Sequence, residues 1–391
     1  MSANSALITR LRVAAGCVRD SVSRPVSDDP SWVPPGPDSV SPRWLHAALA
    51  CPNDVEISAI RHRHLSSGTS NRGFLDIDYA PGAPEDLPRT LFVKSASSYL
   101  TRLQVGVTGG LEGEIRFYRR IQPSLVGVPS PQGYFGVSDR RSGRAIVLME
   151  DVGSTRSATF GDAARLPLTR AEAESMVDTL GALHGSLRNS PRFADGLRWL
   201  PSSERVQSRL NAMVDFRARV LVGLRRAENV APPALLAHRG HLHEALMASL
   251  AEDDQHPRTL LHSDVHADNW FRTDDGRLGL FDWSAISQGR GERDLAYAVM
   301  SALKVEDRRA WERELVERYA DTVGRISGSP VDPAQAWEGY RRQTVHGLCM
   351  WLYTLGRGPL QPRMQPPEII DANVLRMTTA VADLETMSLY T

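Results

Sequence analysis

The segment from residue 262 to residue 269 carries the densest group of reactive side chains in this chain. It reads His-Ser-Asp-Val-His-Ala-Asp-Asn, and Asp282 follows thirteen residues after Asn269. Phosphoryl transfer needs an acceptor for a hydroxyl proton and oxygen ligands that hold Mg²⁺ against a triphosphate. One proton acceptor and two metal ligands could be supplied by Asp264, Asn269 and Asp282. The spacing therefore predicts transfer of a phosphoryl group to a hydroxyl.

A β-hairpin is expected between Asn269 and Asp282. Two apolar runs, 270–272 and 278–281, flank the sequence Thr-Asp-Asp-Gly. Asp-Gly between apolar runs is a strong signal for a tight turn joining two antiparallel strands. Such a hairpin would bring Asp282 back toward the segment that carries Asp264.

Lysine is rare in this chain, which makes Lys94 informative. Of 46 basic residues, 44 are arginine and two are lysine. Lys304 lies in a charged stretch and is interpreted as solvated, whereas Lys94 ends an apolar strand at 91–93. A compact ammonium meets a phosphate as a point charge, unlike the bulkier forked guanidinium. The position of Lys94 at the end of an apolar strand therefore needs a specific explanation, and a phosphate partner would suit an ammonium.

These motifs resemble the protein-kinase-like superfamily, specifically its aminoglycoside phosphotransferase and ecdysteroid-kinase-like families. The catalytic loop of those families reads H-x-D-x-H-x-x-N. His262, Asp264, His266 and Asn269 fill its fixed positions, with Ser263 where glycine is commoner. Later motifs also match, with Phe-Asp-Trp around Asp282 and Asp-Leu-Ala beginning at residue 294. The resemblance covers roughly residues 40–390.

The resemblance implies an ATP- and Mg²⁺-dependent enzyme with defined site residues. Asp264 would act as catalytic base, and Asn269 and Asp282 would complete the catalytic group as metal ligands. Lys94 would contact the α- and β-phosphates, with Glu114 as its partner.

The resemblance also implies where the rest of ATP would bind. Segment 66–73 would be the phosphate-covering loop, and segment 147–152 the hinge that binds adenine between two lobes. The cofactor-binding residues expected there are Gly68, Thr69, Ser70, Asn71, Glu150 and Val152.

The order of predicted elements indicates an α+β, bilobal protein-kinase-like fold. Strands near 55–60, 74–79, 90–93, 133–137 and 145–149 surround a helix at 111–121, which predicts a small antiparallel-sheet lobe. After residue 150 helices dominate, including predicted helices at 171–187 and 206–224. The expected domains are an N-terminal arm or linker at 1–37, a nucleotide-binding N-lobe at 38–151 and a helical C-lobe at 152–391. His184, on an apolar helix face, and His266 are interpreted as structural.

Composition excludes several other classes. The formal net charge is zero, which removes the electrostatic case for nucleic acid or an anionic membrane surface. No apolar run approaches the roughly 18–20 residues that cross a bilayer. Three widely spaced cysteines argue against a disulfide framework, so a cytoplasmic location is expected. The sequence leaves oligomeric state open.

Several alternatives remain at this point. Alternating His and Asp at 262–268 could bind Zn²⁺ in a metallohydrolase, although that would give the hairpin no role. Only 11 residues separate Asp282 from Asp294, too few for the long activation loop of a protein kinase, so a small-molecule alcohol is the expected acceptor. A nucleotide-binding regulator without catalysis, transfer of AMP instead of phosphate, and an antibiotic-modifying role stay open. From residue 301 onward the chain has 12 acidic and 11 basic residues, which favours a neutral or partly apolar alcohol over a polycation.

Overall fold

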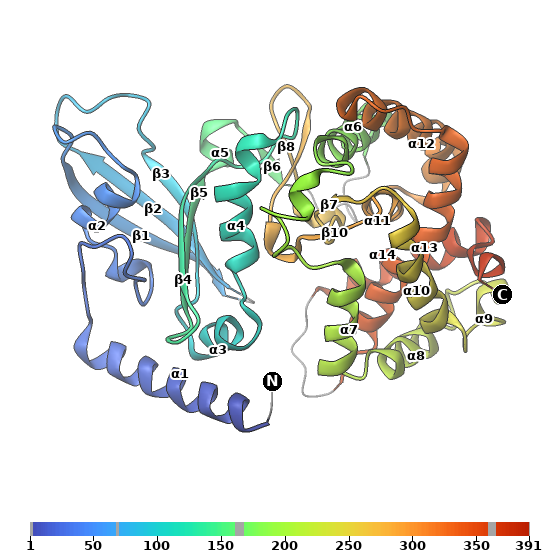
Figure 1. Ribbon diagram of the computed structural model, residues 1–391, viewed down its shortest axis with the longest axis horizontal. Coiled ribbons are helices and arrows are strands. Elements are labelled where there is room, and N and C mark those ends of the chain that lie inside the picture. The colour runs from blue at the N-terminus through green and yellow to red at the C-terminus, as the bar shows by residue number, and fades with distance from the viewer. Residues whose placement is uncertain (1–2, 68–69, 161–167, 359–364, 391) are drawn as a thin grey trace. The chain divides into compact units, whose positions relative to one another are not determined.

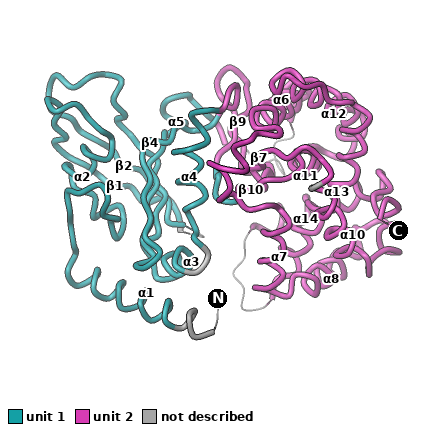
Figure 2. Tube along the Cα trace, in the orientation of Figure 1, with its two compact units in different colours: residues 1–124, 130–158, 282–285 teal, residues 125–129, 159–281, 286–391 magenta. Residues whose placement is uncertain are grey.

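The computed structural model describes residues 3–67, 70–160, 168–358 and 365–390 (Figure 1). The chain divides into two compact units (Figure 2). Unit 1 contains residues 1–124, 130–158 and 282–285, and unit 2 contains residues 125–129, 159–281 and 286–391. Unit 1 therefore takes in the short segment that begins with Asp282, although most of unit 1 comes from the first 158 residues.

Unit 1 is built on a five-stranded antiparallel sheet with strand order β1-β2-β3-β5-β4. Its inward side chains form a core around Leu75, Leu91, Val93, Ile146 and Leu148. The alternation of buried and exposed residues in β2 matches the two-residue period of a half-buried strand. The strands are β1 (Ile57–Ser67), β2 (Asn71–Tyr79), β3 (Thr90–Ser95), β4 (Gly133–Asp139) and β5 (Arg144–Glu150).

Helices cover the sheet of unit 1. Helix α2 packs on β1, and α4 lies along β4 and β5 (Figure 1). Ser41 caps α2 by accepting a hydrogen bond from the Trp44 amide at 3.0 Å, as its sequence predicts. Helix α3 was not expected. The helices are α1 (Ala3–Ser23), η1 (Pro37–Ser39), α2 (Pro42–Ala48), α3 (Tyr99–Thr108), α4 (Glu112–Arg120), η2 (Gln122–Ser124) and α5 (Val152–Thr155).

The N-terminal segment, for which an arm or linker is expected, is tied to unit 1 by a buried carboxylate. Asp20 on α1 lies 2.6 Å from Arg102 Nη1 and 3.0 Å from Arg144 Nε, and its side chain is 3% exposed. The charge of Asp20 therefore links α1 to α3 and to β5.

Unit 2 is mostly helical. Helix α12 packs on α6, and α13 packs on α8, α11 and α14. Its helices are α6 (Arg170–Ser186), η3 (Pro191–Phe193), α7 (Ser203–Met213), α8 (Phe216–Arg226), α9 (Pro233–Leu236), α10 (Leu242–Ala251), η4 (Glu252–Gln255), η5 (Ala267–Asn269), α11 (Glu292–Ala302), α12 (Val305–Ser327), α13 (Pro333–Leu355), α14 (Pro367–Asp383) and η7 (Thr386–Leu389). The short helix η6 (Trp283–Ala285) belongs to unit 1.

The single helix predicted over 206–224 is wrong. The chain forms α7 and α8 instead, with Val214 in an extended conformation between them. The Asp215 carboxylate accepts a hydrogen bond from the Ala218 amide at 3.1 Å and so starts a new helix. Because aspartate caps helices well, it overrides the apolar period that continues across the break.

The predicted hairpin is confirmed. Strands β8 (Trp270–Arg272) and β9 (Leu278–Leu280) pair antiparallel, and Gly276 adopts the positive φ of 79° that such a turn uses. Strand β6 (Thr159–Phe160) extends this sheet, while β7 (Thr259–Leu261) pairs with β10 (Ser287–Gly289). The antiparallel sheet in unit 1 and the helices in unit 2 confirm the predicted α+β class.

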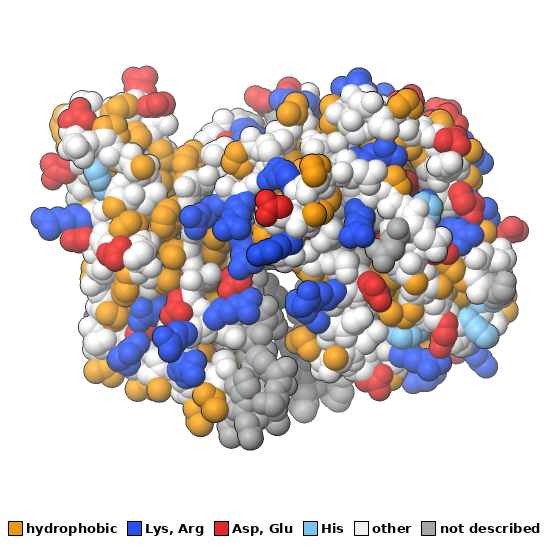
Figure 3. Space-filling view, viewed as in Figure 1, with side chains coloured by type: hydrophobic (Ala, Val, Ile, Leu, Met, Phe, Trp, Pro, Cys, Tyr) orange, Lys and Arg blue, Asp and Glu red, His pale blue; other side chains and the backbone are white. Residues whose placement is uncertain are grey.

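No helix among the residues that the structure describes is long and apolar enough to span a membrane. Basic and acidic side chains both appear on the displayed face of each unit (Figure 3), in keeping with a formal net charge of zero.

Candidate active site

Lys94 on β3 forms the centre of a buried charged cluster in unit 1. Its Nζ lies 2.9 Å from Glu114 Oε1 and 2.9 Å from Asp282 Oδ1, and its side chain is 2% exposed. Helix α4 buries Ile115 and Phe117, which turns Glu114 toward the sheet. The partner of Lys94 is therefore Glu114, whereas Glu112 pairs with Arg140 at 2.5 Å.

Lys94 and Asp282 are held in their charged forms, whereas burial raises the pKa of Glu114. Burial disfavours the Lys94 ammonium, but the carboxylates of Asp282 and Glu114 outweigh burial and raise the pKa of Lys94. Burial likewise opposes ionisation of Asp282, but Lys94 and Arg72 hold the pKa of Asp282 well below its usual range. These shifts favour the ionised forms of both Lys94 and Asp282 near neutral pH.

Asp282 is fixed by its neighbours and by an unusual backbone. Its φ is 64°, in the left-handed region that non-glycine residues rarely adopt. Ser284 Oγ donates to Asp282 Oδ1 at 2.9 Å, and the next residue, Trp283, stacks on Phe117 with ring centroids 3.8 Å apart. Residues in such strained conformations often occur at functional sites.

Arg72 on β2 is a member of this cluster that sequence reasoning missed. Its Nη2 lies 3.2 Å from Asp282 Oδ2. Segment 66–73 was expected to cover phosphates, but an arginine in a chain with 44 of them carries no distinguishing signal. Only the pairing of β2 with β3, which sets Arg72 opposite Lys94, reveals it.

The residues expected to cover the phosphates have different positions. Gly68 and Thr69 lie outside the described residues. Ser70 is buried and lines a cavity of about 40 Å³ that also includes Asp282. Asn71 Oδ1 accepts hydrogen bonds from the Ser97 backbone amide at 3.1 Å and from Thr101 Oγ1 at 3.1 Å. The Asn71 side chain therefore stabilises the start of α3.

The expected hinge residues lie at the end of β5 and directly after it. Glu150 ends β5, where its carboxylate accepts from Arg156 Nη2 at 2.5 Å and from the Gln132 amide at 2.9 Å. Val152 is buried and begins α5. The Glu150 side chain is thus committed to holding the turn after β5.

The loop that carries Asp264 is stabilised within unit 2 by Asn269. Asn269 Nδ2 donates to the Asp264 carbonyl at 2.7 Å and lies 3.2 Å from Asp264 Oδ2. His262 Nε2 lies 2.9 Å from the Phe281 carbonyl, and the Phe281 amide donates to the Asn269 carbonyl at 3.1 Å. The hairpin therefore returns to the loop, and Asp282 is the next residue of the chain.

Asp294 at the start of α11 holds the backbone just before Asp264. Its carboxylate accepts from the amides of His262 at 2.7 Å and Ser263 at 3.1 Å. Ser263 has φ 70°, which explains why glycine is commoner at this position. Its hydroxyl lies 2.8 Å from Ser287 Oγ, a contact that offsets part of the strain.

The expected site residues thus form two groups. Asp264 and Asn269 are in contact within unit 2, while Asp282, Lys94 and Glu114 are in contact within unit 1. Among the residues that the structure describes, no three His, Cys, Asp or Glu side chains are arranged to hold a metal ion. This counts against the zinc alternative, which needs several such ligands around one ion.

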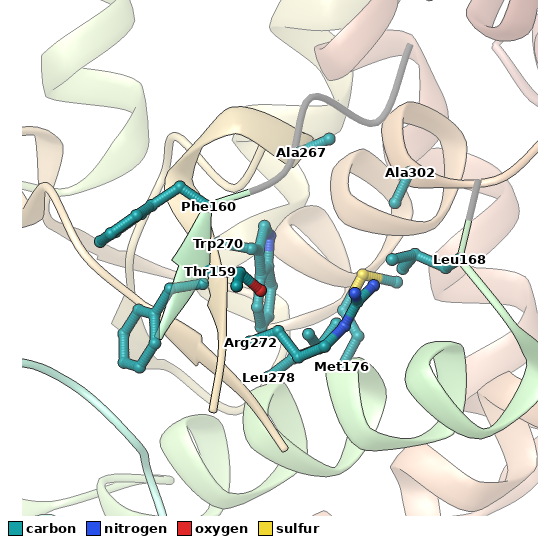
Figure 4. Close-up of a pocket in the computed structure, with 10 residues that line it drawn as sticks. Thr159, Phe160, Leu168, Met176, Ala267, Trp270, Arg272, Leu278 and Ala302 are labelled. Carbon is teal, nitrogen blue, oxygen red and sulfur yellow. The ribbon is translucent and has the colours of Figure 1, made fainter. Parts of the chain in front are cut away.

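A larger cavity of about 250 Å³ lies in unit 2 (Figure 4). It is lined mainly by apolar side chains, including Met176, Trp270 and Leu278, and Ala267 of the loop that carries Asp264 contributes to its wall. Among the described residues that line it, Arg272 carries the one charged side chain and pairs with Glu172 at 2.6 Å. The described lining residues therefore offer no unpaired charge for a phosphate.

The sequence matches the profile of the phosphotransferase enzyme family (APH) over residues 62–341. The chain belongs to this family. The match spans both the Lys94 cluster and the loop that carries Asp264, and it confirms the resemblance that these motifs indicate. Among curated proteins, none matches the sequence.

Several solved structures are similar to this chain. The choline kinase from Cryptosporidium parvum Iowa II is 13% identical, with a TM-score of 0.50 over 85% of this chain and 91% of that chain. The choline kinase LicA from Streptococcus pneumoniae is 15% identical, with a TM-score of 0.44 over 88% and 98% of the two chains. An aminoglycoside phosphotransferase from Alicyclobacillus acidocaldarius is 14% identical, with a TM-score of 0.44 over 85% and 94%. The similarity to the first confirms the kinase-like fold.

Proposed function

We propose that this chain transfers the γ-phosphoryl group of ATP to a hydroxyl of a small molecule. The observation that carries this proposal is the buried Lys94 ammonium, which bridges Glu114 and Asp282 at 2.9 Å each. Phosphoryl transfer relies on positioned charges rather than covalent chemistry. A lysine held by two carboxylates in a 2% exposed position has the fixed charge and orientation to bind nucleotide phosphates.

Asp264 is the proposed base. Its side chain is 43% exposed, whereas that of the neighbouring His266 is 10% exposed, so a hydroxyl can approach the carboxylate. Asp294 fixes the loop backbone on one side and Asn269 on the other. Asp264 would accept the hydroxyl proton as the acceptor oxygen attacks the γ-phosphorus and the bond to the β-phosphate oxygen breaks.

Asn269 and Asp282 are the proposed Mg²⁺ ligands. Asn269 uses Nδ2 for its contacts to the loop, so Oδ1 is the atom that would ligate the metal. Carboxylate and amide oxygens are ligands that Mg²⁺ accepts. The bound cation would neutralise charge on the phosphates, and Arg72 is placed to contribute further positive charge beside Asp282.

A small acceptor is supported by the segment between Asp282 and Asp294. Residues 287–289 form β10, which pairs with β7 in unit 2. This stretch is therefore committed to a sheet and leaves no long segment for binding a protein substrate. The nearly balanced charge after residue 301 favours a neutral or partly apolar alcohol over a polycation.

The test is a panel of hydroxylated compounds incubated with γ-labelled ATP and Mg²⁺, followed by mass spectrometry of the products. The panel includes sterol-like alcohols, choline, an aminoglycoside and a macrolide. We expect one compound to gain a single phosphoryl group. Gain of AMP would replace the proposal with adenylyl transfer. ATP binding without any transfer would indicate a regulator, and a phosphorylated antibiotic would identify a resistance role.

A further inference from the structure

His184 on α6 was expected to be a structural core histidine, but its contacts lead to the catalytic loop. Its side chain is 1% exposed, and its Nε2 lies 3.5 Å from Asp294 Oδ2. The same carboxylate accepts the amides of His262 and Ser263, which precede Asp264. One side chain therefore separates His184 from the backbone that orients the proposed base.

The ring of His184 is held by a second buried side chain. Its Nδ1 lies 2.8 Å from the Tyr319 hydroxyl on α12, and the two rings cross at 76°. A ring protonated at Nε2 accepts from this hydroxyl and presents its N–H to Asp294. Among the described residues Nε2 has no partner at full hydrogen-bond geometry, and its contact with the Asp294 carboxylate is an ion-pair contact at 3.5 Å.

Close packing prevents the ring from turning away. A Cβ on Gly291 would lie 2.3 Å from the Tyr319 hydroxyl and 2.8 Å from His184 Nδ1, so the backbone at the start of α11 approaches both groups closely. Thr259 Oγ1 also donates to the His184 carbonyl at 2.6 Å. Residues from α6, β7, α11 and α12 thus fix one imidazole in one orientation.

The charge on Asp294 depends on this arrangement. The carboxylate is fully buried, and an isolated buried charge is costly. Burial opposes ionisation, but the contact with His184 and the nearby His262 outweigh it and lower the pKa of Asp294. An ionised Asp294 accepts both loop amides more strongly than a protonated one.

We propose that His184 and Tyr319 are positioning residues that act through Asp294 to hold Asp264 in its productive orientation. The inference rests on the proposed phosphotransferase function. It assigns to His184 an effect on the chemical step, because the contacts of His184 lead through Asp294 to the backbone just before Asp264.

The test uses four variants of the full chain. His184→Phe removes the polar ring, His184→Gln keeps a donor and an acceptor, and Tyr319→Phe removes the hydroxyl that orients the ring. Tyr340→Phe is the matched control. The Tyr340 hydroxyl is also buried and makes a 2.8 Å hydrogen bond, but its partner is Glu312, between α12 and α13.

Two readouts are combined. In hydrogen–deuterium exchange, the peptide that contains His262 and Ser263 should exchange roughly tenfold faster in His184→Phe and Tyr319→Phe than in Tyr340→Phe. Phosphoryl transfer at saturating substrate should fall at least about tenfold in His184→Phe, with ATP affinity measured by calorimetry unchanged within about twofold. His184→Gln should recover much of both losses.

Equal exchange and equal transfer in Tyr319→Phe and Tyr340→Phe, or no recovery in His184→Gln, would overturn the proposal. A wild-type protein that phosphorylates no compound in the panel would instead refute the proposed function. In that case the exchange measurement alone still decides whether His184 and Tyr319 hold the loop.

Discussion

Lys94 contacts two carboxylates in a space with almost no solvent, so its shape matters as much as its charge. We expect Lys94→Arg to lower phosphoryl transfer at least about tenfold, because the wider guanidinium cannot keep both 2.9 Å contacts without moving Glu114 or Asp282. Steady-state kinetics measures the change. Lys304→Arg makes the same substitution at an exposed position and should leave transfer unchanged. Equal kinetics for the two variants would remove Lys94 from the site.

Ser263 shows strain that a substitution can measure. At φ 70° a glycine is relaxed, whereas alanine keeps the strain and loses the contact to Ser287. We expect Ser263→Gly to be more stable than Ser263→Ala by about 1 kcal/mol. Chemical denaturation measures the difference in the free energy of unfolding. Equal stability of the two variants would show that the left-handed backbone is not maintained in solution.

At this scale the sequence could predict the residues with distinctive types at fixed spacing. Lys94 stands out because lysine is rare, and Glu114 because it occupies the expected helix position. Arg72 and His184 could not be found in the same way. Their roles come from contacts with Asp282 and Asp294 across more than a hundred residues, and their types are common in such positions.

At the scale of elements, the stacking of Trp283 on Phe117 connects η6 to α4 within unit 1. We expect Trp283→Ala to destabilise the protein by about 3–5 kcal/mol. We also expect it to reduce phosphoryl transfer more than a control variant of similar stability, because Asp282 directly precedes Trp283 and loses the anchoring of that ring. Trp44→Ala is the control, since the side chain of Trp44 on α2 is as fully buried as that of Trp283. Thermal unfolding gives the stability of each variant. Phosphoryl transfer is then compared at a temperature below both melting temperatures. Equal residual transfer would mean that Trp283 does not position Asp282.

Element types could be predicted better than element boundaries. The hairpin β8–β9 and the strands of unit 1 follow from alternation and turn residues. The division between α7 and α8 does not, because the apolar period continues across Asp215 and only the cap formed by its side chain ends the helix. Strand β1 extends to Ser67, beyond its apolar part, because pairing with β2 supplies its hydrogen bonds.

At the scale of the whole molecule, Asp20 tests whether the first residues are part of the folded protein. Replacing this carboxylate leaves Arg102 and Arg144 buried without their partner. We expect Asp20→Asn to destabilise unit 1 by about 3–5 kcal/mol at neutral pH. Asp28→Asn, in an exposed ion pair of the same segment, should cost less than about 1 kcal/mol. Chemical denaturation distinguishes the two.

The pH dependence of the Asp20 effect has a defined sign. Burial opposes ionisation, but Arg144 and Arg102 outweigh it and lower the pKa of Asp20 below 3.8. The stabilisation is therefore complete above this value and is lost as pH falls through the lower folded-state pKa. The difference between wild type and Asp20→Asn should shrink below about pH 4. A difference that stays constant down to acid pH would contradict the buried ion pairs.

The central claim is that Asp264 takes the hydroxyl proton during transfer, and Asp264→Asn tests it most directly. The measurement is single-turnover transfer from γ-labelled ATP to the acceptor found in the panel, with ATP affinity measured separately by calorimetry. Asp268→Asn, the same change four residues later on the loop, is the control. We predict that Asp264→Asn slows transfer at least about 100-fold while ATP affinity stays within about twofold, and that Asp268→Asn retains most transfer. Transfer by Asp264→Asn at close to the wild-type rate would contradict the account.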